Sequence, residues 1–275
     1  MAIFDAVKSM TKRNAARSGP RLLTEHRAFH LTPNMIRIVF AGPELADFPT
    51  GREGGNCKLM FPSPGETKAE FADRLAAKPS PTKRTYTVRK FDPEAGELSI
   101  DFVDHGDSGP ASGWACRAKP GAFLGFAGPS GPKVTHFEAD WYLIACDPSA
   151  VPVAAATLEA MPRDAKGVAV FEITSDADRE GFEADIDMPA GIAVHWLTHG
   201  EPQKPSRAQE DFIRSLDWPE GRVQTCIAGE SGVIRALKEV VLKEKALPKG
   251  DVYISGYWKI GLNEDAHQQA KRAEG

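Results

Sequence analysis

The chain has 275 residues, which suggests two domains, and its 41% hydrophobic and 26% charged residues are enough for ordinary globular cores. Its net charge of -4 argues against nucleic acid or a membrane surface as the default partner. No apolar run reaches the roughly 18–20 residues that cross a bilayer, and the amphipathic start is too polar for a secretory signal, so we expect a soluble, cytoplasmic protein.

The first part of the chain predicts short strands separated by glycine and proline turns. The expected strands are 21–31, 35–41, 57–61, 85–91, 97–103 and 122–127. Strands at this spacing are typical of a closed barrel or a sandwich, and we place an antiparallel β-barrel domain at residues 18–132. The polar stretch 63–83 predicts a long excursion with a short helix at 69–77.

The pattern changes after residue 131, where the apolar run 141–146 predicts a buried parallel strand. The further expected elements are helix 150–160, strand 168–173, strand 193–197, helix 209–216, strand 223–227, helix 233–242 and strand 252–255. This alternation predicts a parallel sheet with helices on its faces. We place this α/β domain at 139–275, with a short charged helix at 263–275. A barrel followed by such a domain predicts a flavin between the two and a second nucleotide on the sheet.

Four cysteines, at positions 57, 116, 146 and 226, lie far apart and form no CxxC pair. We expect buried thiols that act as small hydrophobic residues, with neither a disulfide nor a metal site of the protein's own. Any iron chemistry here must use iron brought in by a ligand.

The segment RTYTVR (84–89) is the first candidate cofactor element. Tyr86 can cover one face of an isoalloxazine ring by offset stacking, and Thr87 can hydrogen-bond a ring nitrogen. Arg84 can pair with a phosphate through its planar fork, and strand alternation places Arg84, Tyr86 and Val88 on one face. Taken alone, this short motif is better explained as an exposed amphipathic strand.

A second candidate element follows in DFVDHG (101–106) and GPASGWA (109–115). A short helix is expected at 112–117, and the free N–H groups at its start suit the pyrophosphate of FAD. Ser112 equally suits a simple N-cap, and His105 equally suits a loop histidine bonded to backbone. We prefer a cofactor contact for His105 because it lies between the two candidate phosphate elements.

Seven segments together carry a resemblance to a known family. They are CKLMFP (57–62), KRTYTVRKFD (83–92), LSIDFVDHGDSGPASGWA (98–115), GPSGP (128–132), ADWYLIACDPSAVPVAAATLEAMP (139–162), IAGES (227–231) and YISGYWKIGLNEDAH (253–267). From about residue 21 to residue 266 the chain resembles the siderophore-interacting proteins, FAD-containing ferric-siderophore reductases of the ferredoxin-reductase architecture. The blocks HG…GPAS…WA and GYWKxG are the most specific part of this resemblance.

The resemblance implies roles for individual residues. Arg84, Tyr86, Thr87 and Val88 would hold the isoalloxazine and ribityl region of FAD. The ribityl, pyrophosphate and adenine parts would contact Asp101, Val103, His105, Ala111 and Ser112. The siderophore would meet basic residues at Lys58, Lys259 and, as a weaker candidate, Lys133, although each alone is typical of a solvated surface lysine. Electrons would come from NADH, NADPH or, in one branch of the family, ferredoxin.

The candidate donor site begins at CDPSAVP (146–152), after the first strand of the α/β domain, where such sheets bind ligands. The family usually has a GDETALP type of turn here, and no GxGxxG motif is present, so the ferredoxin branch stays open. Asp147 or Ser149 can still cap the following helix. Glu230 and Trp258 complete the candidate site, but Glu230 also suits a first-turn glutamate and Trp258 also suits a core position.

We therefore expect a monomeric ferric-siderophore reductase in which a donor reduces FAD and FAD reduces Fe(III), with no general acid or base assigned. Two alternatives stay open. One is a general NAD(P)H–flavin or quinone oxidoreductase of the same architecture. The other is a flavin-carrying siderophore-binding protein with little turnover. The identity of the siderophore and of the electron donor is left open by the sequence.

Overall fold

The computed structural model describes residues 19–77, 81–107 and 109–274. They fall into two compact units: the first combines the described residues up to Phe29 with those of Arg37–Pro132, and the second combines His30–Ile36 with the described residues from Lys133 onward. The amphipathic start of the chain and the predicted domain start at residue 18 lie outside the described residues. Within the described ranges, no helix has the length and apolar character needed to cross a membrane.

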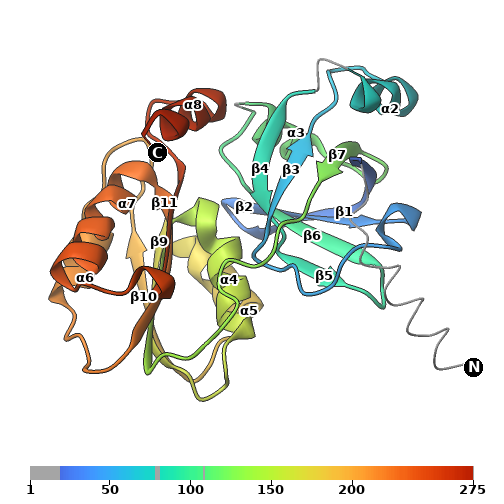
Figure 1. The fold of residues 1–275 in the computed structure, drawn as a ribbon. Coiled ribbons are helices and arrows are strands. Elements are labelled where there is room, and N and C mark those ends of the chain that lie inside the picture. The colour runs from blue at the N-terminus through green and yellow to red at the C-terminus, as the bar shows by residue number, and fades with distance from the viewer. Residues whose placement is uncertain (1–18, 78–80, 108, 275) are drawn as a thin grey trace, which may run out of the picture. The chain divides into compact units, whose positions relative to one another are not determined.

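In the described part of the first unit, seven strands form one sheet in the order β4-β3-β7-β1-β2-β6-β5 (Figure 1). Their bounds are β1 Arg21–Thr32, β2 Met35–Ala41, β3 Asn56–Met60, β4 Lys83–Thr87, β5 Lys90–Asp92, β6 Glu97–Val103 and β7 Phe123–Ala127. The β1–β7, β3–β4, β3–β7 and β5–β6 pairs are antiparallel. Because β4 also contacts β6, the sheet curls toward closure, and the predicted antiparallel barrel is confirmed.

Alternation of apolar residues builds the core of this unit. Along β6, Leu98, Ile100 and Phe102 are fully buried while the residues between them are mostly polar. Helix α3, Pro110–Arg117, packs its Trp114 ring 5.9 Å from that of Phe102. Helix α2, Lys68–Ala76, has a complete capping box at its start and lies in the predicted excursion. Both helices begin one or two residues earlier than the sequence predicts.

The predicted single strand 85–91 is wrong, because the backbone changes partners in its middle. β4 ends at Thr87, and the Val88 N–H donates to the carbonyl of Gly55 at 2.9 Å. The next N–H, of Arg89, donates to the carbonyl of Ser99 in β6 at 3.1 Å. The chain thus leaves the β3 side and joins the β6 side within two residues. Strand alternation from Arg84 therefore does not extend to Val88.

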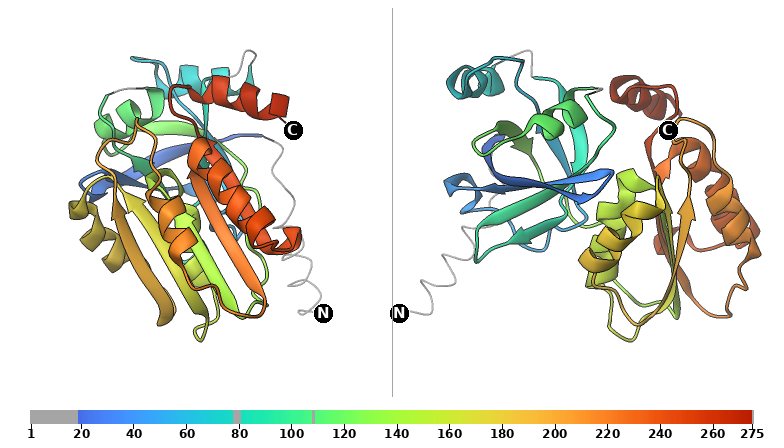
Figure 2. Two further views of the ribbon diagram at one scale, coloured as in Figure 1. Left: turned by 90° about the vertical axis from the view of Figure 1, so that its left-hand side faces the viewer. Right: turned by 180° about the vertical axis from the view of Figure 1, so that it is seen from behind.

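In the described part of the second unit, five strands form a parallel sheet in the order β10-β9-β8-β11-β12. The strands are β8 Trp141–Cys146, β9 Lys166–Ile173, β10 Gly191–Thr198, β11 Val223–Glu230 and β12 Val252–Trp258. The helices are α4 Val151–Ala160, α5 Arg179–Asp185, α6 Ala208–Ser215, α7 Ser231–Lys238 and α8 Glu264–Glu274. Helices α4 and α5 cover one face of the sheet, and α6 and α7 cover the other (Figures 1 and 2). The predicted parallel α/β arrangement is confirmed.

This sheet is apolar on both faces, as a parallel sheet between two helical layers requires. Leu143 and Ala145 of β8 face the α6–α7 layer, where they join a cluster with Ile213 and Ile234. On the other face, α4 is buried along nearly its whole length and is rich in alanine. Strand order reverses between β8 and β11, so their carboxyl ends mark the point where open α/β sheets bind ligands.

The second unit differs from the sequence predictions in three ways. Helix α5 was not predicted, because its short sequence buries only Phe182. Helix α7 spans Ser231–Lys238 instead of 233–242, and the chain continues as a π-helical turn at Glu239–Glu244. Strands β11 and β12 run on to Glu230 and Trp258, because the glycine-containing ends of both strands stay paired in the sheet.

Candidate functional site

In the first unit, the antiparallel register of β3 and β4 sets the direction of the motif side chains. Tyr86 lies opposite Cys57 and Arg84 lies opposite Leu59, so the two motif residues share one face of the strand pair. The half-buried Tyr86 ring rests on the buried Phe102 ring, with centroids 4.5 Å apart and planes tilted by 40°. Phe102 therefore fixes the tyrosine ring in position, as a stacking platform requires.

The neighbouring motif residues are buried. Thr87 and Val88 are almost fully covered. Asp101 accepts two hydrogen bonds from the Arg37 guanidinium, at 2.7 and 2.8 Å, and lies 3.9 Å from Nε of the buried Arg89. This carboxylate is thus engaged by two arginines and links β6 to β2 and to the segment that follows β4. Its predicted contact with FAD stays a prediction.

The start of helix α3 forms the second candidate element. Its N-cap is Gly109, with φ 82°, and no side-chain hydrogen bond caps this helix start in the described residues. The buried Ser112 donates to the Gly106 carbonyl at 2.8 Å and accepts from the His105 N–H at 3.2 Å. Ser112 therefore lies inside the first turn of the helix, not at the N-cap, and it fastens the exposed loop that carries His105.

These features fit a phosphate-bearing cofactor. The first N–H groups of a helix without a side-chain cap bind anions readily. A Cβ atom built at Gly106 or Gly109 would meet nothing within 4 Å, so the loop and the helix start border open space. Val103 and Ala111 are half-buried beside them. The pattern that the sequence predicts for FAD is therefore physically compatible with the structure of this unit.

The cysteines follow the prediction in three of four positions. Cys57, Cys146 and Cys226 are buried, and burial raises the pKa of the Cys226 thiol to about 11. Cys116 is exposed, which corrects the expectation of a buried thiol. Its Sγ lies on the outer side of α3, 3.3 Å from the Asp104 carboxylate.

In the second unit, Asp147 follows β8 and is buried. It accepts hydrogen bonds from the Ser149 N–H at 2.9 Å, from the Ser149 hydroxyl at 2.6 Å and from Nε1 of Trp258 at 2.7 Å. Burial raises the pKa of Asp147, and these donors lower it in part. A Cβ atom at Gly229 would lie 2.8 Å from the Asp147 carboxyl carbon, so this close approach requires glycine. Asp147 is thus the N-cap of the 3₁₀ turn Pro148–Ala150, whereas the N-cap of helix α4 is Ala150, which makes no side-chain cap hydrogen bond, so the predicted capping of this helix by Asp147 or Ser149 is corrected.

Glu230 is the N-cap of α7 and not a first-turn residue. Its carboxylate accepts from the N–H groups of Gly232, at 2.5 Å, and Val233, at 3.0 Å. The other carboxylate oxygen accepts from the Ile260 N–H at 3.2 Å. The structure thus brings the predicted donor-site residues Asp147, Ser149, Glu230 and Trp258 together at the carboxyl edge of the sheet.

A pocket of about 410 Å³, part of it open to solvent, lies at this edge. It is lined by Asp147, Pro148, Glu172, Ile173, Thr174, His199, Pro202, Lys204, Ser206, Gln209, Glu230, Val233, Trp258 and Ile260. Sequence reasoning missed the residues contributed by β9, by the loop after β10 and by α6. The available signal was the position of Glu172 near the end of a predicted parallel strand, since strand ends of this kind form the ligand edge.

The three candidate siderophore-binding lysines occupy separate places. Lys58 is exposed on β3 and bonds to the Thr85 hydroxyl, and so points to the face of β3 and β4 opposite that of Tyr86. Lys259 is half-buried and lies directly after β12. Lys133 is also half-buried and lies where the chain enters the second unit, before β8. Their common role in binding a siderophore stays a prediction.

An antiparallel barrel followed by a parallel α/β sheet with a ligand-type edge is the architecture of flavin-dependent oxidoreductases related to ferredoxin reductase. Residues 25–133 match the family model of the siderophore-interacting FAD-binding domain, and residues 139–261 match that of the siderophore-interacting protein. The chain belongs to the siderophore-interacting protein family.

The similarity to known proteins extends over nearly the whole chain. The ferric vibriobactin reductase ViuB of Vibrio cholerae is 33% identical over 259 residues, covering 92% of this chain and 94% of the relative. The NADPH-dependent ferric-chelate reductase of Escherichia coli is 31% identical, covering 86% and 92%. Among solved structures, the siderophore-interacting protein SipS from Aeromonas hydrophila has a TM-score of 0.79 at 33% identity, covering 93% and 98%.

Proposed function

We propose that this protein is an FAD-dependent ferric-siderophore reductase that releases iron as Fe(II) in the cytoplasm. The observation that carries the proposal is the match to both domains of one family, together with 33% identity to a ferric vibriobactin reductase over 92% of the chain. The supported rings of Tyr86 and Phe102 and the start of α3 without a side-chain cap are the features that a bound FAD requires.

When bound, FAD supplies the link between a two-electron donor and a one-electron acceptor. Tyr86 would lie against the flat ring system, while Arg84 and the first N–H groups of α3 would bind the phosphates. His105 borders the phosphates from the loop that Ser112 fastens. The remaining proposed contacts are Thr87, Val88, Asp101, Val103 and Ala111.

The overall reaction balances without a proton-transferring side chain. A hydride from NADH or NADPH carries two electrons, so one donor molecule reduces two Fe(III) ions to Fe(II) and releases one proton. Fe(II) binds hard oxygen ligands more weakly than Fe(III), so the iron leaves the siderophore after reduction. The donor meets the edge formed by Asp147, Ser149, Glu230 and Trp258, and reduced ferredoxin is the alternative donor.

The siderophore complex is commonly anionic, and we assign its recognition to Lys58, Lys259 and Lys133. Lysines on a protein surface act by long-range attraction and weak contact, which suits a bulky chelate that does not enter a deep pocket. We assign the working form as a monomer, because no proposed contact requires a second copy.

The test is an anaerobic two-stage experiment. Protein loaded with FAD is mixed with NADH, NADPH or reduced ferredoxin, and flavin bleaching is followed. A ferric siderophore is then added, and a ferrous chelator reports Fe(II). Rapid Fe(II) release supports the proposal. Faster turnover of quinones than of chelates identifies a general reductase, and chelate binding without Fe(II) identifies a siderophore-binding protein.

A further inference from the structure

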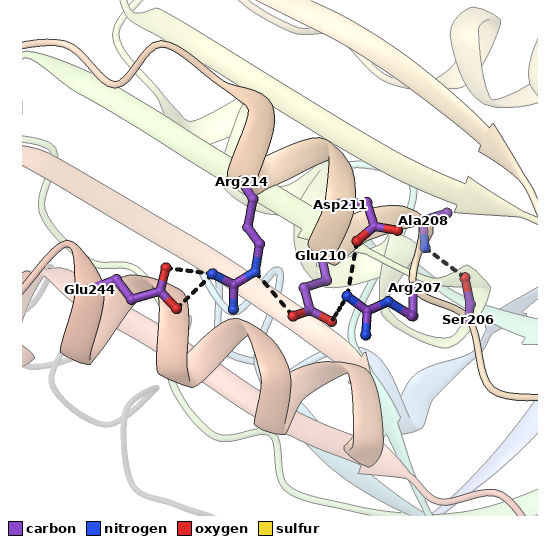
Figure 3. Close-up of polar contacts among 7 residues, drawn as sticks. All are labelled: Ser206, Arg207, Ala208, Glu210, Asp211, Arg214 and Glu244. Carbon is purple, nitrogen blue, oxygen red and sulfur yellow. Dashed lines mark hydrogen bonds and ion pairs between the residues drawn. The ribbon is translucent and has the colours of Figure 1, made fainter.

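The end of strand β9 places a carboxylate in the pocket that no assigned role uses. Glu172 is buried, lines the pocket and accepts a hydrogen bond from the Ser206 hydroxyl at 3.1 Å, and the Gln209 side chain also hydrogen-bonds its carboxylate. The Ser206 oxygen in turn accepts from the Ala208 N–H at 3.2 Å, drawn in Figure 3. Because the Ser206 oxygen accepts from that N–H, its own hydroxyl proton is donated to Glu172. A carboxylate has about four acceptor positions, so Glu172 keeps acceptor capacity for a ligand.

A second buried polar group lines the same pocket. Gln209, the second residue of α6, is 3% exposed, and its Oε1 has no hydrogen-bond partner among the described residues. An unpartnered amide oxygen in a buried place is costly unless a donor reaches it. A ligand hydroxyl or amino group in the pocket is such a donor.

The outer side of α6 fixes the direction of Gln209. Arg214 pairs with Glu210 at 3.1 Å and with Glu244 of the π-helical turn at 2.6 Å, and Arg207 pairs with Asp211 at 3.2 Å (Figure 3). These pairs lie on the exposed side of the helix and hold it against the neighbouring turn. Gln209 is therefore kept on the inner, pocket side.

The charges around the pocket discriminate between ligands. Three carboxylates line it, those of Asp147, Glu172 and Glu230. Among the described lining residues the cations are limited to Lys204, which already pairs with Glu201 at 2.6 Å, and to His199 when protonated. A dianionic phosphate would meet mainly negative charge here, whereas hydroxyl groups would find acceptors.

We propose that Glu172 accepts hydrogen bonds from the ribose diol of an adenosine dinucleotide without a 2′-phosphate, and that Gln209 receives a second donor of the same adenosine. In open α/β sheets, an acidic residue one strand after the first binds this diol in NAD-dependent proteins, and β9 is that strand. NADH is therefore the preferred electron donor of this chain, in contrast to the relative that is named as NADPH-dependent. This inference rests on the proposed function.

The test measures binding without turnover. ADP-ribose and 2′-phospho-ADP-ribose are titrated by calorimetry into the protein loaded with FAD. The wild type should bind ADP-ribose at least about tenfold more tightly than it binds 2′-phospho-ADP-ribose. Glu172→Gln should weaken the binding of ADP-ribose about tenfold and so reduce the preference for ADP-ribose over 2′-phospho-ADP-ribose. Glu172→Asp should keep part of that preference. Gln209→Leu should weaken both probes.

A matched control is Glu180→Gln, which removes the same charge from an exposed site on α5 outside the pocket and should change neither affinity. Unchanged flavin absorbance and a cooperative thermal unfolding transition show that each variant is folded. Equal or tighter binding of 2′-phospho-ADP-ribose by the wild type, no binding of either probe, or unchanged affinity in Glu172→Gln overturns the inference. Failure of the proposed function is seen separately, as no Fe(II) release after the flavin is reduced with one equivalent of dithionite, so that no excess reductant remains to reduce the chelate directly.

Discussion

Asp101 of the barrel unit and the carboxylates at the sheet edge of the α/β unit are buried in opposite ways. In the barrel unit, Asp101 is paired with the Arg37 guanidinium through two hydrogen bonds, and the cationic Arg89 lies close by. At the sheet edge of the α/β unit, among the described residues, Asp147 and Glu172 are held by neutral donors and not by an arginine. Asp147 accepts from the Ser149 N–H and hydroxyl, the Trp258 indole N–H and the Glu230 backbone, and Glu172 is hydrogen-bonded by the Ser206 hydroxyl and the Gln209 side chain.

The contrast shows which buried charge serves the framework and which serves a ligand. A carboxylate saturated by arginines has little capacity for another partner, and it ties strands together. A carboxylate held by neutral dipoles stays electrostatically unbalanced, which is why burial raises the pKa of both Asp147 and Glu172. Such groups lie at the ligand edge of the parallel sheet, where perturbed groups are typical of functional sites.

The largest effect is expected from breaking the paired carboxylate. Arg37→Met leaves Asp101 buried with its bidentate partner removed, and we expect a loss of about 3–5 kcal/mol in the free energy of unfolding. Urea unfolding measures it. The control is Arg163→Met, which breaks an exposed pair with Asp187 and should cost less than about 1 kcal/mol. Equal losses in the two variants would show that Asp101 is not held by this pair.

The next effect comes from removing a neutral donor. Trp258→Phe takes the indole N–H from Asp147, and we expect a loss of about 1–3 kcal/mol at neutral pH. The indole favours the charged carboxylate, so the loss should shrink as the pH falls through the raised pKa of Asp147 in the folded protein.

The matched control is Trp218→Phe, because the Trp218 indole donates to the neutral carbonyl of Ile213 at 3.2 Å. Its cost should not depend on pH between pH 5 and pH 8. Thermal unfolding of both variants across that range makes the comparison. A pH-independent loss in Trp258→Phe would mean that the indole does not stabilise a charged Asp147.

Local sequence patterns predicted the fold well where one segment carries the signal. The apolar run of β8 and the alternation in β6 each lie within a few residues, and both strands have the predicted bounds. The break between β4 and β5 could not be seen, because it depends on Val88 and Arg89 bonding to different strands.

The candidate site at the sheet edge was only half visible in the sequence. Asp147, Glu230 and Trp258 end or follow strands that the sequence predicted in part, so they were found. Glu172 and Gln209 acquire their role from strand order and helix packing, which bring distant residues to one pocket. The pairing of Arg37 with Asp101 was missed for the same reason, because the two residues are distant in sequence.

A smaller effect should appear in the pH dependence of stability. Burial raises the pKa of Glu172 in the folded state above its ordinary 4.5. The folded protein therefore binds more protons than the unfolded chain, and wild-type stability falls as the pH rises from about 4.5 through the folded pKa. The thermal midpoint of Glu172→Gln should rise relative to wild type over that window.

Glu66 in the barrel unit provides a test of opposite sign. Its hydrogen bonds with Arg74 lower its pKa, so it stabilises the folded state above the ordinary 4.5 and loses this effect as the pH falls through the folded pKa. Glu66→Gln should therefore lose stability relative to wild type as the pH rises. Curves of the same sign for Glu66→Gln and Glu172→Gln would remove the electrostatic distinction between the units.

The smallest effect concerns one candidate lysine in each unit. Lys58→Glu on β3 and Lys259→Glu after β12 should each raise KM for an anionic ferric chelate a few-fold, because a docking charge at the surface acts on encounter and is screened by salt. Flavin reduction by the donor and the flavin spectrum should not change, since neither lysine is assigned to FAD. Added salt should bring wild-type KM toward that of the variants. If both variants match wild type at low ionic strength, these lysines are ordinary surface residues and Lys133 becomes the first position to test. If only one variant changes KM, the siderophore is recognised by that unit alone, and the two units differ in substrate contact as they do in the way they bury charge.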